Sequence, residues 1–156
     1  MKKEDSPGVS LPPPSIYGLF FGISLLLQKL LPIDKYFFSS DVSKVIGFLL
    51  LAVCLVFDLP SLIQFFKTKN TLITIKSANS LQTKGLYSIS RNPMYTGLLC
   101  LYSSLAILVG NWWTVLFIPF VFFTIQVYVI RREENYLTRR FGQQFIDYKK
   151  RVRRWL

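Results

Sequence analysis

Two short polar stretches of this 156-residue chain gather side chains that can bind a charged ligand. The first covers residues 83–97 and reads TKGLYSISRNPMYTG; the second covers residues 131–137 and reads RREENYL. Arg91 in the first stretch is always charged and can form a forked contact with a carboxylate. Pro93 favours the start of a helix, which leaves nearby backbone N–H groups free to bind an anion or a polar ligand. These residue types therefore predict a binding site for a charged, polar molecule.

Aromatic and glycine residues flank Arg91 on both sides. Tyr87 and Tyr95 offer flat faces for an aromatic ring and hydroxyl groups for hydrogen bonds. Gly85 and Gly97 permit close approach of a ligand or of another helix. A purely structural interpretation stays open, in which Arg91 is a membrane anchor whose charged end reaches water and the tyrosines belong to an interfacial belt.

The second stretch contains two adjacent carboxylates, Glu133 and Glu134. Neighbouring carboxylates at a membrane boundary resist ionising together unless cations compensate them. Arg131 and Arg132 can do this, and so can a positively charged ligand. The alternative is a solvated helix face on which the glutamates simply pair with the arginines.

Four apolar runs must position these stretches, at residues 15–31, 45–66, 93–109 and 112–130. The chain is 51% hydrophobic yet carries a formal charge of +11, and its charged and apolar residues are separated into blocks, as is typical of a bilayer protein. Because about 20 apolar residues cross a bilayer, we expect an all-α, polytopic membrane protein with about four transmembrane helices. A cleaved signal peptide is the alternative for the first run, but no cleavage motif follows it, which favours a retained helix.

The third and fourth runs are joined only by Gly110 and Asn111, which predicts a tight hairpin. Trp112 and Trp113, directly after this turn, fit an aromatic belt at the membrane interface. A hairpin returns the chain to the face of the bilayer from which it entered. The two polar stretches, at the entrance and the exit of the hairpin, are therefore expected to form one site.

Beyond residue 130 the chain is strongly charged. Gly142 predicts a helix break, after which Phe145, Tyr148, Val152 and Trp155 recur at intervals of three and four residues. This stripe, surrounded by Lys and Arg, predicts a basic amphipathic helix on the membrane surface. A nucleic-acid-binding tail is an alternative, but basic residues beside membrane spans are expected from topology alone.

The distribution of Lys and Arg predicts the orientation in the membrane. If four helices span, with a connection at residues 34–44, then the tail 1–14, the segment 67–92 and the C-terminal tail share one side and hold 16 of the 19 Lys and Arg residues. The positive-inside rule places this side, with both termini, in the cytosol. We accordingly divide the chain into the N-terminal tail, a first helix pair at 15–66 and a ligand-binding region at 67–156.

Composition excludes several kinds of chemistry. The chain has no histidine, which excludes histidine-ligated metal centres, Ser-His-Asp triads and histidine general bases. Cys54 and Cys100 both lie within apolar runs, so no disulfide is expected. We expect no metal and no nucleic-acid partner, and we assign no catalytic base.

The spacing of both stretches resembles a known family. The pattern T-x-G-x-Y-x-x-x-R-N-P-M-Y-x-G, followed after the hairpin by E-E-x-x-L-x-x-x-F-G-x-x-[FY]-x-x-Y-x-x-x-V-x-R, is similar to the isoprenylcysteine carboxyl methyltransferase and phospholipid methyltransferase superfamily. The similarity covers roughly residues 71–155, and residues 1–66 match only in being hydrophobic. It implies an integral membrane methyltransferase that holds S-adenosylmethionine at the cytosolic edge, between the last helices and the C-terminal segment.

The resemblance also implies which residues contact the cofactor. Carried over position by position, they comprise one segment before Gly85, the aromatic and Arg-Asn-Pro residues of the first stretch and the glutamate pair: Asn79, Ser80, Leu81, Gln82, Tyr87, Arg91, Asn92, Pro93, Met94, Tyr95, Glu133 and Glu134. The methyl acceptor is expected to be hydrophobic or lipid-like and to enter from the surrounding membrane lipids.

Two positions depart from the family pattern. Asn92 stands where an Arg-His-Pro motif has histidine; because asparagine can still form hydrogen bonds, cofactor binding is expected to persist. Val129, four residues before the glutamate pair, replaces an arginine that carboxyl methyltransferases of this family use to bind substrate. Since an apolar side chain cannot hold a carboxylate, a prenylcysteine carboxylate is disfavoured as the substrate.

Asp58 is a carboxylate within the second apolar run, where charge is costly and usually functional. It either lines the substrate cavity or pairs with a cation for structural reasons. Two other classes of protein also remain: a non-catalytic assembly factor or anchor subunit, which would not need the Tyr87, Arg91 and glutamate combination, and a small transporter, which would show an internal repeat or a polar path.

Overall fold

The computed structural model of the chain describes residues 6–67 and 80–156, and helices make up most of that part. The α-helices are α1 (Pro13–Leu30), α2 (Asp41–Lys67), α3 (Pro93–Val109), α4 (Trp112–Thr124), α5 (Arg131–Phe141) and α6 (Gln143–Arg151). Two short 3₁₀ helices, η2 (Tyr36–Ser39) and η3 (Gly85–Ser88), lie in the connections, and a π-helix, η4 (Ile125–Ile130), joins α4 to α5. Within the described ranges the structure contains no β-strand. The all-α fold class is confirmed.

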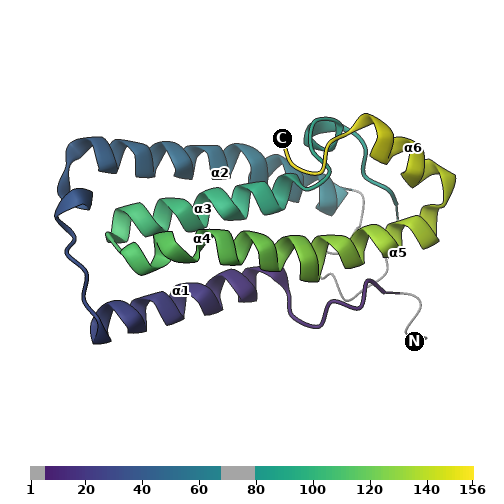
Figure 1. The fold of residues 1–156 in the computed structure, drawn as a ribbon. Coiled ribbons are helices and arrows are strands. Elements are labelled where there is room, and N and C mark those ends of the chain that lie inside the picture. Colours follow the sequence, from purple (N-terminus) through teal and green to yellow (C-terminus); the bar gives the residue numbers. More distant parts are fainter. Residues whose placement is uncertain (1–5, 68–79) are drawn as a thin grey trace.

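The helices α1 to α4 lie alongside one another in an elongated bundle (Figure 1). The helix α3 contacts α2 on one side and α4 on the other, and α1 packs mainly against α4. The segments α4, η4 and α5 follow one another without a break, so that α5 extends beyond the bundle and α6 turns back toward it (Figure 1). One end of the bundle therefore carries both polar stretches.

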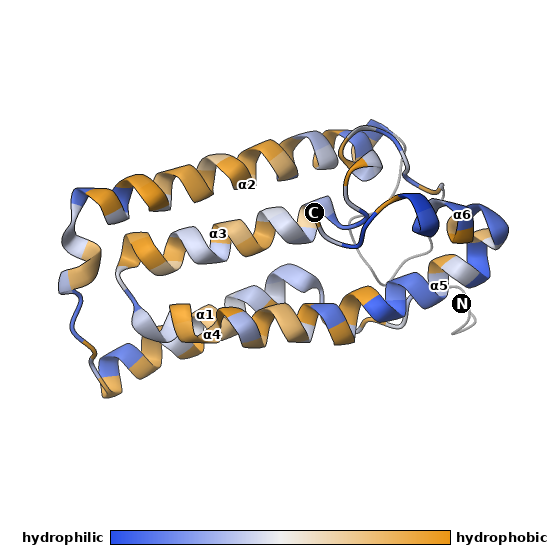
Figure 2. Ribbon diagram, turned by 45° about the horizontal axis from the view of Figure 1, so that its top comes forward, coloured by the Kyte–Doolittle hydropathy of each residue, from blue (hydrophilic) through white to orange (hydrophobic). Residues whose placement is uncertain are grey.

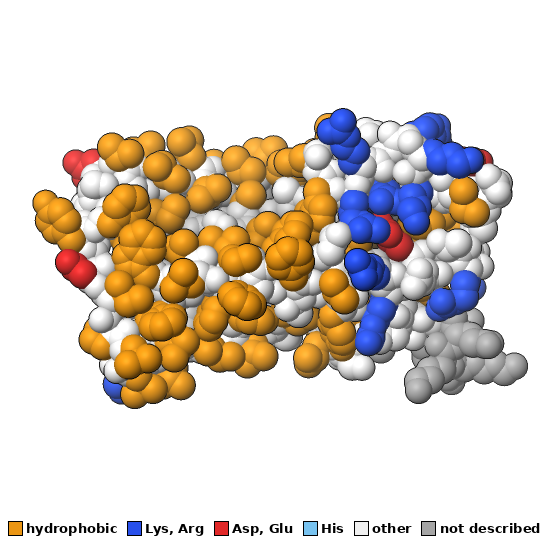
Figure 3. Space-filling model, viewed as in Figure 1, with side chains coloured by type: hydrophobic (Ala, Val, Ile, Leu, Met, Phe, Trp, Pro, Cys, Tyr) orange, Lys and Arg blue, Asp and Glu red, His pale blue; other side chains and the backbone are white. Residues whose placement is uncertain are grey.

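Much of the bundle surface is apolar. Two helices are long and apolar enough to cross a membrane, α2 and the continuous helix Trp112–Phe141, while α3 is apolar but shorter. Hydrophobic residues dominate the bundle helices (Figure 2), and on the visible face Lys and Arg gather at the end that carries α5 and α6 (Figure 3). Such an extensive exposed apolar surface is unusual on a soluble monomer. The fold is that of a helical membrane protein with two candidate spans; a total of four spans stays a prediction.

The helices α2 and α3 approach each other closely because small residues line their interface. The hydroxyl of Ser104 on α3 donates a hydrogen bond of 2.8 Å to the carbonyl of Gly47 on α2. Farther along, Gly97 on α3 packs directly against the carboxyl group of Asp58 on α2. Small residues at such contacts are typical of helix pairs in membranes, where close van der Waals packing supplies much of the association energy.

The hairpin between α3 and α4 is confirmed. Gly110 adopts a left-handed conformation with φ of 70°, which glycine adopts without steric cost. The side-chain oxygen of Asn111 then accepts a hydrogen bond of 3.0 Å from the backbone N–H of Trp113 and caps α4. A buried contact of 2.7 Å between the hydroxyls of Ser24 and Thr114 joins this end of the hairpin to α1.

Two predicted boundaries are wrong. The connection expected at residues 34–44 ends at Ser40, because its hydroxyl accepts a hydrogen bond of 3.2 Å from the backbone N–H of Ser43 and caps α2 one turn early. The C-terminal helix stops at Arg151 instead of continuing through Trp155, and the backbone at Val152 is extended. Beyond it the chain folds back onto the bundle.

The C-terminal apolar stripe packs within the protein. Phe145 is 1% exposed, and the hydroxyl of Tyr148 donates a hydrogen bond of 2.6 Å to the backbone carbonyl of Tyr87. The predicted break at Gly142 is confirmed, with φ of 52° at that residue. The apolar face of α6 is thus used to fasten the helix to the η3 segment, which leaves the basic face outside.

Candidate functional site

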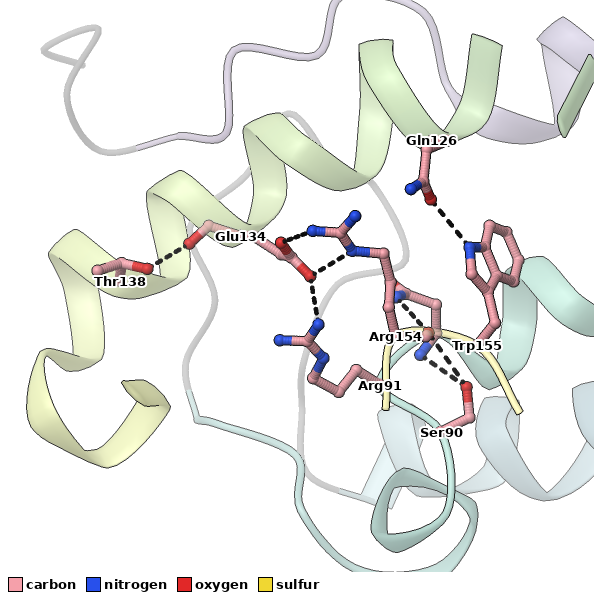
Figure 4. A network of polar contacts seen from close by, with 8 residues as sticks. Ser90, Arg91, Gln126, Glu134, Thr138, Arg154 and Trp155 are labelled. Carbon is pink, nitrogen blue, oxygen red and sulfur yellow. Dashed lines mark hydrogen bonds and ion pairs between the residues drawn. The ribbon is translucent and has the colours of Figure 1, made fainter. Parts of the chain in front are cut away.

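Glu134 is the centre of a buried ion network at the polar end of the bundle (Figure 4). Its side chain is 9% exposed, and one carboxylate oxygen lies 3.0 Å from Nη2 of Arg91. Arg154 adds a forked contact, from Nε at 2.9 Å to the same oxygen and from Nη2 at 2.6 Å to the other. Both oxygens of Glu134 are therefore occupied by guanidinium groups, and three segments distant in sequence meet at one carboxylate.

The last residues of the chain complete this network. The backbone N–H of Arg91 donates to the carbonyl of Arg153 at 2.9 Å, and the side-chain amide of Asn92 donates to the carbonyl of Arg154 at 2.8 Å. Trp155 donates from its indole nitrogen to the side-chain oxygen of Gln126 at 2.9 Å (Figure 4). The ring of Trp155 also packs against that of Phe122. The C-terminal segment thus forms one wall of the candidate site.

The side chain of Arg91 has nitrogen atoms that form no hydrogen bond with the described residues. Its side chain is 9% exposed, and only Nη2 contacts Glu134; the buried Nε and Nη1 atoms have no hydrogen-bond partner among the described residues. Burial lowers the pKa of Arg91 from its ordinary value, while the nearby carboxylate of Glu134 acts in the opposite direction. Because buried N–H groups without partners are costly, this arginine is prepared for an additional acceptor, such as the carboxylate of a ligand.

Glu133 has different surroundings from Glu134. One of its oxygens accepts a hydrogen bond of 2.7 Å from the hydroxyl of Tyr95 at the start of α3. No arginine is paired with Glu133 in the part of the chain that the structure describes. The helix hairpin therefore does bring the two predicted stretches together, with Tyr95 touching Glu133 and Arg91 touching Glu134.

Tyr87 is buried, and its ring lies against that of Phe65 on α2 with 5.9 Å between the centroids. Burial raises the pKa of Tyr87 above its ordinary value, and the negative charges of Glu133 and Asp58 act in the same direction. A hydrogen bond with the side chain of Ser61 acts in the opposite direction. Tyr87 thus contacts Phe65 on α2 with its ring and Tyr148 on α6 through its backbone carbonyl.

The other predicted residues divide into three groups. Pro93 is buried at the first position of α3, and Met94 beside it is half-buried. Ser80, Leu81 and Gln82 line a separate cavity against α2, where the side chain of Gln82 accepts a hydrogen bond of 2.9 Å from Gln64. Asn79 lies outside the described residues.

Asp58 pairs with no cation among the described residues. The thiol of Cys54, one turn earlier on α2, donates a hydrogen bond of 3.4 Å to one of its oxygens, and the other oxygen is buried without a described partner. Val129, where the family pattern has arginine, is fully buried in the bundle core. Of the two roles expected for Asp58, pairing with a lysine or arginine is not observed in the described part of the chain.

Sequence reasoning did not assign a role to Arg154, although this residue is the last position of the V-x-R pattern quoted above. The signal was the motif itself, which ends in arginine after a helical stripe. Gln126 and Trp155 were also missed. Their pairing depends on the reversal of the chain after Arg151, which no local pattern indicates.

The fold and this site together define a class: a helical membrane protein with a buried arginine and two carboxylates at the polar end of its bundle. The sequence model of the phospholipid methyltransferase family matches residues 42–144, about two thirds of the chain. The chain belongs to this family, which agrees with the resemblance seen in the motifs. An uncharacterized protein from Haemophilus influenzae is 36% identical over 63 residues, which cover all of that protein and 40% of this chain. No solved structure matches the chain.

Proposed function

We propose that this protein is an integral membrane methyltransferase that uses S-adenosylmethionine and acts on a hydrophobic or lipid-like acceptor at the cytosolic face. The observation that carries the proposal is the pair of buried, unpartnered N–H groups of Arg91, among the described residues, next to the Tyr95–Glu133 hydrogen bond. The family to which the chain belongs supports a methyltransferase. The proposed site is the polar end of the hairpin.

The side chains present fit this cofactor. A carboxylate is a natural partner for a free N–H group of Arg91, because guanidinium N–H groups form charge-assisted hydrogen bonds with carboxylates. Glu133 is suited to an ammonium group or to ribose hydroxyls, since no described arginine pairs with it. Burial raises the pKa of Glu133 to about 7, and a positively charged ligand would favour its ionised form. Glu134, whose oxygens are both occupied, holds Arg91 in place. We therefore assign the cofactor contact to Glu133 and a positioning role to Glu134.

S-adenosylmethionine, when bound, supplies a methyl group on a positively charged sulfur. The protein is left with orientation of the acceptor and exclusion of water, neither of which requires histidine. Asp58 lies next to Gly97, one turn into α3 from the site, and its free oxygen can accept a hydrogen bond from an acceptor's polar group. With Val129 buried and apolar, this environment favours an acceptor without a carboxylate.

The topology that accompanies this function has four spans, α1, α2, α3 and the α4–η4 segment, with both termini in the cytosol. It is supported by the side-by-side arrangement of these helices in one bundle (Figure 1) and by the concentration of Lys and Arg at one end (Figure 3). The ligand-binding region, 67–156, then reaches the cytosol at the end where the cofactor is available.

Binding of S-adenosylhomocysteine tests the proposal. The detergent-purified protein is expected to melt at a higher temperature when this ligand is added, because ligands that bind only the folded state stabilise it. Glu133→Gln removes a charge from a charge-assisted contact and should weaken the affinity for S-adenosylhomocysteine by about 10- to 100-fold. Tyr95→Phe removes only the hydroxyl that orients Glu133 and should weaken this affinity by about fivefold.

The matched control for these variants is Asp147→Asn, which removes a carboxylate from the exposed face of α6. It should leave the affinity for S-adenosylhomocysteine unchanged when all three variants are measured by isothermal titration calorimetry. If the wild-type protein does not respond to millimolar S-adenosylhomocysteine, the enzymatic proposal fails and a non-catalytic membrane subunit becomes the better interpretation.

A further inference from the structure

A cavity of about 680 Å³ lies outside the Arg91–Glu134 network, between the end of α2 and residues 80–84. Its volume falls in the range of small-molecule binding sites. One wall is formed by Leu59 and Ile63 on α2, and Gln64 bridges to Gln82 on the opposite wall at 2.9 Å. A hydrogen bond therefore joins the two sides of this open cavity.

The lining of this cavity changes from apolar to positive along its length. Leu59 and Ile63 are each 52% exposed, whereas the end of α2 contributes Lys67 and the facing segment contributes Lys84. Neither lysine forms an ion pair with any residue that the structure describes. No acidic side chain among the described residues lines the cavity, so its chemistry favours an anion that carries an apolar portion.

The position of the cavity identifies the source of such a ligand. The helix α2 is hydrophobic over most of its length and becomes hydrophilic at the end that bears Lys67 (Figure 2). The exposed side chains of Leu59 and Ile63 continue the apolar surface of α2, whose other exposed residues include Leu55 and Val56. A ligand in the cavity thus has access to the bilayer on one side and to two lysines on the other.

We infer that this cavity binds an anionic membrane lipid, with its phosphate group between Lys67 and Lys84 and an acyl chain along Leu59 and Ile63. Lysines at a membrane surface attract anionic lipids, and the apolar wall distinguishes a lipid from a soluble phosphate compound. This inference goes beyond the proposed methyl transfer, since it requires neither the cofactor nor methylation of the lipid that is bound.

Lipid titrations of the full-length protein in detergent, without cofactor, test the inference. Short-chain phosphatidylglycerol is expected to raise the melting temperature and to remain bound in native mass spectrometry, more strongly than phosphatidylcholine of the same chain length. The double variant Lys67→Ala/Lys84→Ala should lose about 10- to 30-fold in affinity for phosphatidylglycerol, because each lysine near a membrane surface contributes about fivefold.

The control is Lys29→Ala/Lys35→Ala, which removes the same charge from the last turn of α1 and from the connection to α2, away from the cavity. An equal loss of affinity in this control, or equal binding of phosphatidylcholine, would overturn the inference. An equal stabilisation by inorganic phosphate would also overturn it, by showing that the apolar wall is not used. Binding of S-adenosylhomocysteine should persist in the lysine variant, which separates failure of this site from failure of the proposed function.

Discussion

Replacing Glu134 with alanine is expected to lower the free energy of unfolding by about 3 kcal/mol or more. The change leaves the guanidinium groups of Arg91 and Arg154 together without their shared carboxylate, and removal of one partner from a buried ion pair typically costs about 3–5 kcal/mol. The lower end of this range applies because Arg154 is partly exposed, at 28%. Thermal and denaturant unfolding in detergent micelles measure the effect.

A surface ion pair provides the comparison. Asp147→Ala removes a carboxylate that lies 3.7 Å from Lys150, with both side chains largely exposed, and should cost less than about 1 kcal/mol. Arg154→Ala separates the role of the C-terminal segment. If Glu134 acts through that segment, the Glu134→Ala and Arg154→Ala effects will not add in the double variant; strict additivity would contradict the shared network.

Gly97→Val is expected to destabilise the protein by about 3 kcal/mol and to impair binding of S-adenosylhomocysteine. A Cβ atom at this position would overlap the carboxyl group of Asp58, so this side chain or α2 itself must shift to accommodate it. Overpacking of a tight core contact costs about 1–3 kcal/mol, and a shift of α2 also moves Phe65, which contacts Tyr87. Melting temperature and ligand titration report the two effects separately.

The same substitution at Gly22 is the control, because a Cβ atom there meets nothing within 4 Å. Gly22→Val should change stability by less than about 1 kcal/mol. In the Gly97→Val background, Asp58→Ala should restore part of the lost stability by removing the overlapping carboxyl group. If Asp58→Ala gives no recovery, the contact between these two residues does not account for the effect.

The elements that the sequence predicted well are those fixed by local interactions. The hairpin follows from a glycine and a capping asparagine between two apolar runs, and the meeting of Tyr95 with Glu133 follows from the hairpin. Helix ends were less predictable because a single hydrogen bond decides them. Ser40 extended α2 by one turn beyond its apolar run through such a bond.

Contacts made by reversal of the chain could not be predicted. The periodic stripe from Phe145 to Trp155 favoured one continuous helix. In the structure, Trp155 instead bonds to Gln126, and the carbonyl of Arg153 accepts a hydrogen bond from the backbone N–H of Arg91. These contacts replace the hydrogen bonds of a last helical turn. The pairing of Arg154 with Glu134 depends on this reversal. Sequence alone therefore located both glutamates but could not distinguish their roles.

The π-helix η4 has a geometric consequence for those two glutamates. Each residue of an α-helix advances the side-chain direction by about 100° around the axis, whereas the wider π turn accommodates an additional residue without changing the course of the helix. If the same six residues, Ile125–Ile130, were wound as an α-helix, everything beyond them would rotate by about 100°. Glu133 would then turn away from Tyr95, and Glu134 from Arg91. The angular phase of α5, and with it the direction of both carboxylates, is set by one surplus residue inside the bundle.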